Sequence, residues 1–140
     1  MVCVVDDDVS VLRALRRLIG AGGFDVETFV SAEDFLEFPR RGRAVCLVLD
    51  VHLGELSGFE LHERLLASGS RVPVLFITAL DDAATRERAR QAGAVDYLRK
   101  PFDDDMLLGA IRRAVRCGEP ATDGPQPDGG SDIARARNIP

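Results

Sequence analysis

Residues 45–50 form a run of five apolar side chains that ends in a single carboxylate, Asp50. A short apolar run without alternating polar residues is typical of a strand buried on both faces of a sheet. Three similar runs, at 2–5, 74–77 and 95–98, are followed by Asp6 and Asp7, by Thr78, and by Lys100. Because ligands bind at the carboxyl ends of strands in an open parallel sheet, we expect these polar side chains to meet at one site.

Helical segments alternate with these strands. Apolar residues repeat at helical spacing after Ser10, which we interpret as an N-cap, and a strand at 24–30 follows. A short helix is predicted after its cap Ser31, and the next helix carries His62 on its surface. A further helix is capped by Asp81 or Asp82, and the last helix opens with the acidic residues 103–105. The last helix has an inward stripe of Leu107, Ala110, Ile111 and Ala114.

This alternation predicts an α/β domain, in which a five-stranded parallel sheet carries five helices on both faces. Residues 1–117 fit one such domain, with a fifth strand at 94–98. From Gly118 the chain is rich in glycine and proline, so 118–140 is predicted to be a flexible tail or a truncated linker.

Composition limits the classes of function. The 140 residues carry a formal net charge of -5, which argues against a nucleic-acid-binding surface in this region. No apolar run is long enough to span a membrane and no signal peptide precedes the first strand, so we expect a cytoplasmic protein. Cys3 and Cys46 fall in predicted buried strands and Cys117 in the last helix, without metal-type spacing.

The strand ends offer a specific chemistry. Asp6, Asp7 and Asp50 in one cleft would repel one another, so a cation or a bound proton is needed to stabilise them. Hard carboxylate oxygens suit Mg²⁺, which completes its coordination with water and phosphate oxygens. Asp50 beside such a metal could act as a nucleophile toward a phosphoryl group. Lys100 would neutralise phosphoryl oxygens and Thr78 would hydrogen-bond them.

Four segments together resemble the signature blocks of receiver domains of bacterial two-component response regulators: 4–8, 47–50, 76–79 and 97–102. Residues 91–94, Gln-Ala-Gly-Ala, are also similar to those before the last strand of that family, and the resemblance covers residues 1 to about 117. It implies a flavodoxin-like three-layer sandwich with strand order 2-1-3-4-5. It also implies a signalling domain rather than an enzyme, although one that assists its own phosphorylation and dephosphorylation.

The resemblance assigns roles to individual residues. Asp50 would accept a phosphoryl group from a sensor histidine kinase. Asp6, Asp7, Asp50 and the backbone carbonyl of His52 would hold Mg²⁺. The resemblance further implies phosphoryl contacts from Thr78, from the backbone of Ala79 and from Lys100, with a cis peptide bond between Lys100 and Pro101.

The resemblance also implies a switch. On phosphorylation Thr78 would move toward the new oxygens, and Tyr97 would rotate into the vacated space. This movement would alter a face formed by the fourth helix, the fifth strand and the last helix, through which a phosphorylation-dependent homodimer could form. The expected partners are therefore the sensor kinase and, through this face, a second copy of the chain. The chain could also be the N-terminal part of a transcriptional regulator.

Two points depart from the family pattern. The loop after Asp50 has Gly54 and Glu55 where the family usually has proline and glycine, which predicts a looser or reshaped loop with an added negative charge. The alternative hypothesis is a Mg²⁺-dependent phosphohydrolase that uses Asp50 as its nucleophile. Such enzymes carry a second acid two residues after the nucleophile, whereas this chain has His52 there and no large cap domain.

Overall fold

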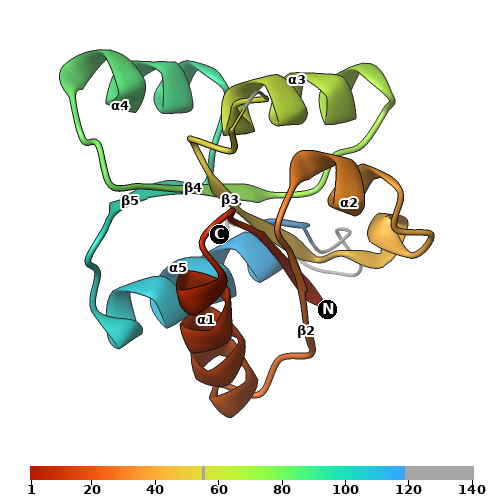
Figure 1. Cartoon of the computed structure of the whole chain (residues 1–140), viewed down its shortest axis with the longest axis vertical. Coiled ribbons are helices and arrows are strands. Elements are labelled where there is room, and N and C mark those ends of the chain that lie inside the picture. The colour runs from red at the N-terminus through yellow and green to blue at the C-terminus, as the bar shows by residue number, and fades with distance from the viewer. Residues whose placement is uncertain (55, 119–140) are drawn as a thin grey trace, which may run out of the picture.

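The computed structural model describes residues 1–54 and 56–118, with side chains through Arg116. Five parallel strands form one sheet in the order β2-β1-β3-β4-β5, and helices cover both of its faces (Figure 1). The predicted three-layer α/β sandwich and its strand order are therefore confirmed. In chain order the elements are β1 (Val2–Val5), α1 (Val9–Ala21), β2 (Val26–Phe29), α2 (Ala32–Leu36), the 3₁₀ helix η1 (Arg41–Arg43), β3 (Cys46–Asp50), α3 (Gly58–Ala67), β4 (Val74–Thr78), α4 (Ala83–Gln91), β5 (Asp96–Arg99) and α5 (Asp104–Gly118).

The three central strands are apolar because both of their faces are covered. Every residue of β1, β3 and β4 is buried, whereas every residue of the edge strand β2 is only partly buried. Burial on both sides explains the unbroken apolar runs that the sequence shows. The strand that ends at Asp50 begins one residue later than predicted, since Val45 is 39% exposed and β3 starts at Cys46.

Two helical layers enclose two separate cores. Helices α1 and α5 cover one face of the sheet, and α2, α3 and α4 cover the other (Figure 1). The predicted inward stripe of α5 is confirmed, because all four of its residues are fully buried. In the opposite core, Phe59 packs against Phe76 with ring centroids 4.7 Å apart.

The cysteines confirm their predicted structural role where the structure describes them. Cys3 and Cys46 are buried free thiols in β1 and β3. Burial raises the pKa of Cys3 to about 11 and that of Cys46 to about 12, so both remain protonated and behave as small apolar side chains.

One helix begins differently from the prediction. Asp8, and not Ser10, caps α1, since its carboxylate accepts hydrogen bonds from the backbone amides of Ser10 at 2.9 Å and Val11 at 3.4 Å. The chain enters the helix at Val9, directly after the turn that follows β1, so Ser10 already lies in the first turn. The caps predicted at Ser31 and at Asp82 are confirmed by bonds of 3.0 and 2.7 Å.

The C-terminal boundary is only partly visible. Helix α5 continues to Gly118, one residue beyond the predicted end of the domain at 117. Residues 119–140, the rest of the predicted tail, lie outside the described residues. Each helix in the described part of the chain is too short or too polar to cross a lipid bilayer.

His62 was predicted on the surface of its helix, and this prediction is wrong. It is 6% exposed and its ring meets Phe76 edge-on, with centroids 5.7 Å apart. It lies three residues after Phe59 and three before Leu65, both buried, so it belongs to the inward stripe of α3. Burial lowers the pKa of the His62 imidazole, an effect that the charge of Glu63 only partly opposes.

Gly58, the first residue of α3, lies directly against the backbone of the strand end that carries Asp50. Its amide donates a hydrogen bond of 2.8 Å to the carbonyl of Val51. A Cβ atom at this position would lie 2.3 Å from the carbonyl oxygen of Asp50, closer than non-bonded atoms can approach. The absence of a side chain at Gly58 therefore lets α3 start beside Asp50.

We expect the substitution Gly58→Ala to destabilise the fold, because the new methyl group must displace the backbone of Asp50. Overpacking of this kind costs about 1–3 kcal/mol. Urea denaturation followed by circular dichroism measures this loss. Gly20→Ala in α1 is the matched control, since a Cβ there meets nothing within 4 Å, and it should be neutral or slightly stabilising. Equal effects of the two substitutions would contradict the close approach at Gly58.

We expect buried His62 to make the fold less stable as the pH falls from neutral toward 5.5. The unfolded chain takes up a proton on His62 near its ordinary pKa of 6.5, whereas the folded chain resists that proton until a lower pH. Unfolding free energies of the wild type and His62→Gln, each measured at pH 7.5 and 5.5, isolate this contribution. The variant should lose less stability over this range than the wild type.

His52→Gln is the control for this experiment, because His52 is exposed. It should keep the pH dependence of the wild type. A pH dependence that disappears in His52→Gln and persists in His62→Gln would contradict the assignment to His62.

Candidate functional site

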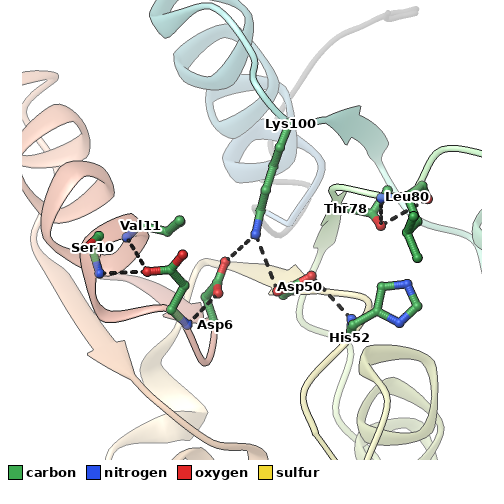
Figure 2. Close-up of polar contacts among 9 residues, drawn as sticks. Asp6, Ser10, Val11, Asp50, His52, Thr78, Leu80 and Lys100 are labelled. Atoms are coloured by element: carbon green, nitrogen blue, oxygen red, sulfur yellow. Dashed lines mark hydrogen bonds and ion pairs between the residues drawn. The ribbon is translucent and has the colours of Figure 1, made fainter.

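The predicted site residues meet at the carboxyl edge of the sheet. Asp6 and Asp7 follow β1, Asp50 ends β3, Thr78 ends β4 and Lys100 follows β5. Figure 2 shows Lys100 reaching from the far side of the cleft to a point between Asp6 and Asp50. The parallel arrangement of the strands therefore brings together residues that are up to 94 positions apart.

Three carboxylates form the floor of the site. Ligand atoms of Asp6, Asp7 and Asp50 all lie within 4.8 Å of one another. Asp6 is fully buried and Asp50 is 5% exposed, while Asp7 is exposed. Oδ1 of Asp6 is oriented by the backbone amide of Asp8, which donates to it at 2.9 Å. Two buried carboxylates and one open to solvent thus face a shared space.

Lys100 supplies the countercharge. Its Nζ lies 2.8 Å from Oδ2 of Asp6 and 3.4 Å from Oδ2 of Asp50. Burial alone would lower the pKa of the Lys100 ammonium. The hydrogen bond to Asp6 and the charges of Asp50 and Asp6 outweigh burial and raise that pKa, so the group stays charged. The peptide bond between Lys100 and Pro101 is cis, as the resemblance implied.

The carboxyl group of Asp50 is harder to ionise than that of an ordinary aspartate. Burial, followed by the negative charge of Asp6, raises the pKa of its carboxyl group to about 6. The backbone amide of His52, which donates to Oδ1 at 3.2 Å, and the ammonium of Lys100 oppose this rise only in part. A further positive charge nearby would favour the ionised form of Asp50.

The donor set fits a hard divalent cation. Carboxylate oxygens without histidine or cysteine ligands are what Mg²⁺ prefers, and an exposed ligand such as Asp7 leaves room for coordinated water. A cation among these oxygens would also supply the charge that Asp50 lacks. The ring of His52 is exposed, and His52 contacts the cluster through its backbone amide.

Thr78 is at the predicted place, but its hydroxyl group bonds elsewhere. The fully buried Thr78 donates a hydrogen bond to the Leu80 carbonyl at 3.1 Å and accepts one from the Leu80 amide at 3.0 Å. Figure 2 shows this pair apart from Asp6 and Lys100. Ala79, the next residue, is exposed at the same edge. A phosphoryl contact from Thr78 therefore requires its hydroxyl to exchange partners.

Tyr97 lies on β5 with its ring partly buried against the core under α4. Its hydroxyl group is buried and has no hydrogen-bond partner among the described residues. The guanidinium group of Arg86 lies over the ring, 5.4 Å from its centroid. Tyr97 is thus enclosed by α4 and does not point freely into solvent.

The loop after Asp50 uses the conformational freedom of glycine at one position. Gly54 has φ +74°, in the left-handed region that proline cannot adopt and that other side chains rarely do. A proline at position 54 could therefore not adopt this backbone conformation. Leu53 and Leu56 on either side are buried, which anchors the loop. Glu55 lies outside the described residues.

Two residues that build the site were missed in the sequence. Asp8 caps α1 and also orients Asp6 through its amide. The helix spacing alone favoured Ser10, although three successive acids before Val9 were a signal for an earlier cap. Gly58 is the second: Ser57 with Glu60 forms a capping box that places Gly58 at the first helical position.

Comparisons with known proteins agree on one family. The sequence model described as "Response regulator receiver domain" matches residues 2–112. The response regulator protein TodT of Pseudomonas putida is 40% identical over 116 residues, which are 83% of this chain and 51% of TodT. The transcriptional regulatory protein FixJ of Bradyrhizobium diazoefficiens is 39% identical over 118 residues, 84% of this chain and 58% of FixJ.

A solved structure agrees with these relatives. The structure of the response regulator StyR is 46% identical, with a TM-score of 0.76, over 84% of this chain and 59% of StyR. The chain thus spans about half the length of the curated relatives it matches. The matched residues include every member of the acidic cluster and Lys100. The chain therefore belongs to the receiver domains of two-component response regulators.

Proposed function

We propose that Asp50 accepts a phosphoryl group from a sensor histidine kinase in a Mg²⁺-dependent reaction. The observation that carries this proposal is the Lys100 ammonium group between Asp6 and Asp50, 3.4 Å from one oxygen of Asp50 in the acidic cluster. Asp6, Asp7, Asp50 and the backbone carbonyl of His52 would hold the metal. A histidine kinase is the general partner of this family, and the reaction would take place in the cytoplasm.

The residues present account for the transfer. An oxygen of Asp50 forms a bond to phosphorus while the bond between phosphorus and the kinase imidazole nitrogen breaks, and that nitrogen keeps the electron pair. Lys100 can stay within reach of Asp50 and neutralise the phosphoryl oxygens. A bound Mg²⁺ would neutralise further negative charge on the transferring group. The domain would thus assist its own phosphorylation and, by the same groups, its dephosphorylation.

The output would be a change of surface. We propose that the Thr78 hydroxyl leaves Leu80 for the phosphoryl oxygens, with help from the amide of Ala79, and that Tyr97 responds to this movement. The face of α4, β5 and α5 would then change and could support a homodimer. Because the chain spans about half the length of its relatives, we propose that its receiver domain, residues 1–117, is the N-terminal part of a regulator such as a transcription factor.

The phosphoacceptor is tested by intact mass after incubation with acetyl phosphate and Mg²⁺. We expect a labile adduct of one phosphoryl group in the wild type and none in Asp50→Asn, because the amide is a poor nucleophile. Removal of Mg²⁺ with a chelator should weaken adduct formation. Asp8→Asn is the matched control, since asparagine also caps helices and Asp8 stands outside the metal cluster.

Two outcomes would contradict this proposal. One is the same adduct in Asp50→Asn as in the wild type. The other is no adduct in a wild-type protein that circular dichroism shows to be folded. Sustained release of phosphate from many donor molecules without an adduct would instead support the phosphohydrolase alternative.

Mg²⁺ binding should weaken as the pH falls through about 6. Below the pKa of Asp50, which burial and the charge of Asp6 raise to about 6, a proton competes with the metal for this carboxylate. Competition by one proton lowers the apparent affinity by up to about tenfold per pH unit. Titration calorimetry from pH 7.5 to 5.0 measures this slope. Asp50→Asn should bind Mg²⁺ more weakly at pH 7.5, and its affinity should depend less steeply on pH. An unchanged slope would show that the competing proton binds to a group other than Asp50.

A further inference from the structure

Three buried side-chain atoms in the described part of the chain lack a hydrogen-bond partner: Nδ1 of His62, Oδ1 of Asp81 and the hydroxyl of Tyr97. Such atoms are rare in folded proteins, because each costs the free energy of its lost hydration. Asp81 and Tyr97 lie close enough for the Asp81 charge to act on the phenol. One is an acceptor without a donor and the other a donor without an acceptor.

Arg86 connects these two residues. Its Nη2 lies 2.5 Å from Oδ2 of Asp81, which leaves Oδ1 of the same carboxylate unbonded. The same guanidinium group covers the face of the Tyr97 ring at 5.4 Å. The Asp81 side chain is only 14% exposed, whereas the Arg86 side chain is 62% exposed. The carboxylate is thus held by one oxygen while the other remains available beside the phenol.

The chemistry of the phenol favours this contact. Burial, then the negative charge of Asp81 and its nearby carboxylate as a hydrogen-bond acceptor, raise the pKa of Tyr97 above its ordinary value, while Arg86 opposes this effect and Asp82 adds to it. The hydroxyl therefore keeps its proton at neutral pH and has to donate it to an acceptor. Oδ1 of Asp81 is such an acceptor, and a bond to a carboxylate is stronger than one between neutral groups.

The contact also bears on α4. Ala89 is the single fully buried residue among the described residues of this helix, so apolar packing holds α4 weakly. Two arginines contribute instead. Arg86 joins it to Asp81 and Tyr97, and Arg88 lies 4.6 Å from the Phe59 ring centroid and 3.7 Å from Glu63 on α3. In Figure 1, α4 lies beside α3 above the end of the sheet formed by β4 and β5.

We propose that Asp81 and Arg86 are positioning residues for Tyr97: Asp81 accepts the hydrogen bond of its phenol through Oδ1, and Arg86 holds Asp81 through Oδ2 and covers the ring. This arrangement fixes Tyr97 beneath α4 before any phosphorylation. The consequence of this arrangement for signalling rests on the proposed function of Asp50, because Tyr97 responds to a phosphoryl group only if Asp50 accepts one. The positioning itself does not depend on that function.

The absorbance and fluorescence of tyrosine report on Tyr97 alone, since the chain has one tyrosine and no tryptophan. The absorbance of phenolate therefore titrates Tyr97 alone. Asp81→Asn should shift the titration midpoint downward, because it removes the negative charge beside the phenol. Glu87→Gln is the matched control, as it removes one charge from an exposed residue of α4 that pairs with Arg90, and should leave the midpoint unchanged. Circular dichroism at each pH confirms that the fold persists.

A double-mutant cycle at neutral pH tests the hydrogen bond without alkaline conditions. The denaturation midpoints of Asp81→Ala, which removes the acceptor, of Tyr97→Phe and of the double variant should be non-additive, with the second substitution costing little once the first has been made. Acrylamide quenching of Tyr97 fluorescence should rise in Arg86→Ala and be partly restored in Arg86→Lys. Additive midpoints, together with unchanged quenching and an unchanged titration, would overturn the proposal.

The two proposals fail separately. The measurements above use no phosphodonor, so they decide the positioning of Tyr97 whatever Asp50 does. Beryllofluoride with Mg²⁺, a phosphoryl mimic, then tests the link. The wild-type fluorescence of Tyr97 should change on its addition, and Arg86→Ala should alter this change without abolishing the acetyl phosphate adduct on Asp50. An adduct-free wild type with non-additive midpoints would refute the function of Asp50 and leave the positioning intact.

Discussion

The ion pair between Lys100 and the two buried carboxylates of Asp6 and Asp50 is the contact on which the site depends. The Nζ atom of Lys100 lies 2.8 Å from Oδ2 of Asp6 and 3.4 Å from Oδ2 of Asp50. Without this countercharge, two carboxylates in a poorly hydrated cleft could not both remain ionised. Even with it, the pKa of Asp50 is raised to about 6. The three carboxylates thus carry more negative charge than Lys100 balances, and they could hold a divalent cation.

The parallel sheet explains why such a costly cluster exists at one place. Strands β1, β3 and β4 are apolar up to their ends, where the first polar side chains are Asp6 after β1, Asp50 in β3 and Thr78 in β4. The register pairs Val5 with Leu49 and Asp50 with Ile77, which aligns these ends along one edge. Gly58 adds a second constraint, because its missing side chain allows α3 to pack on the backbone of Asp50.

Features set by chain periodicity were predictable, and features set by side-chain partners across the fold were not. The apolar runs predicted the strands, and the strand ends predicted which polar residues meet. The strand order came from the resemblance. Asp8 and His62 were misjudged, although local spacing contained the signal for both. The bond from Thr78 to Leu80 and the contact of Arg86 with Asp81 and Tyr97 depend on rotamers and loop geometry, which no periodic pattern encodes.

In the described part of the chain, the buried polar atoms without hydrogen-bond partners lie near the α-helix that has the fewest buried residues. All three buried atoms without partners in the described chain lie on residues beneath or beside α4, and this helix contributes one buried residue to the core. Arginines over aromatic rings, which are exposed contacts of modest strength, add to its attachment. A helix held in this way can change position at low cost in free energy. The core strands, whose side chains are fully buried, cannot. Among the described α-helices, α4 is therefore the one that the fewest buried side chains hold in place.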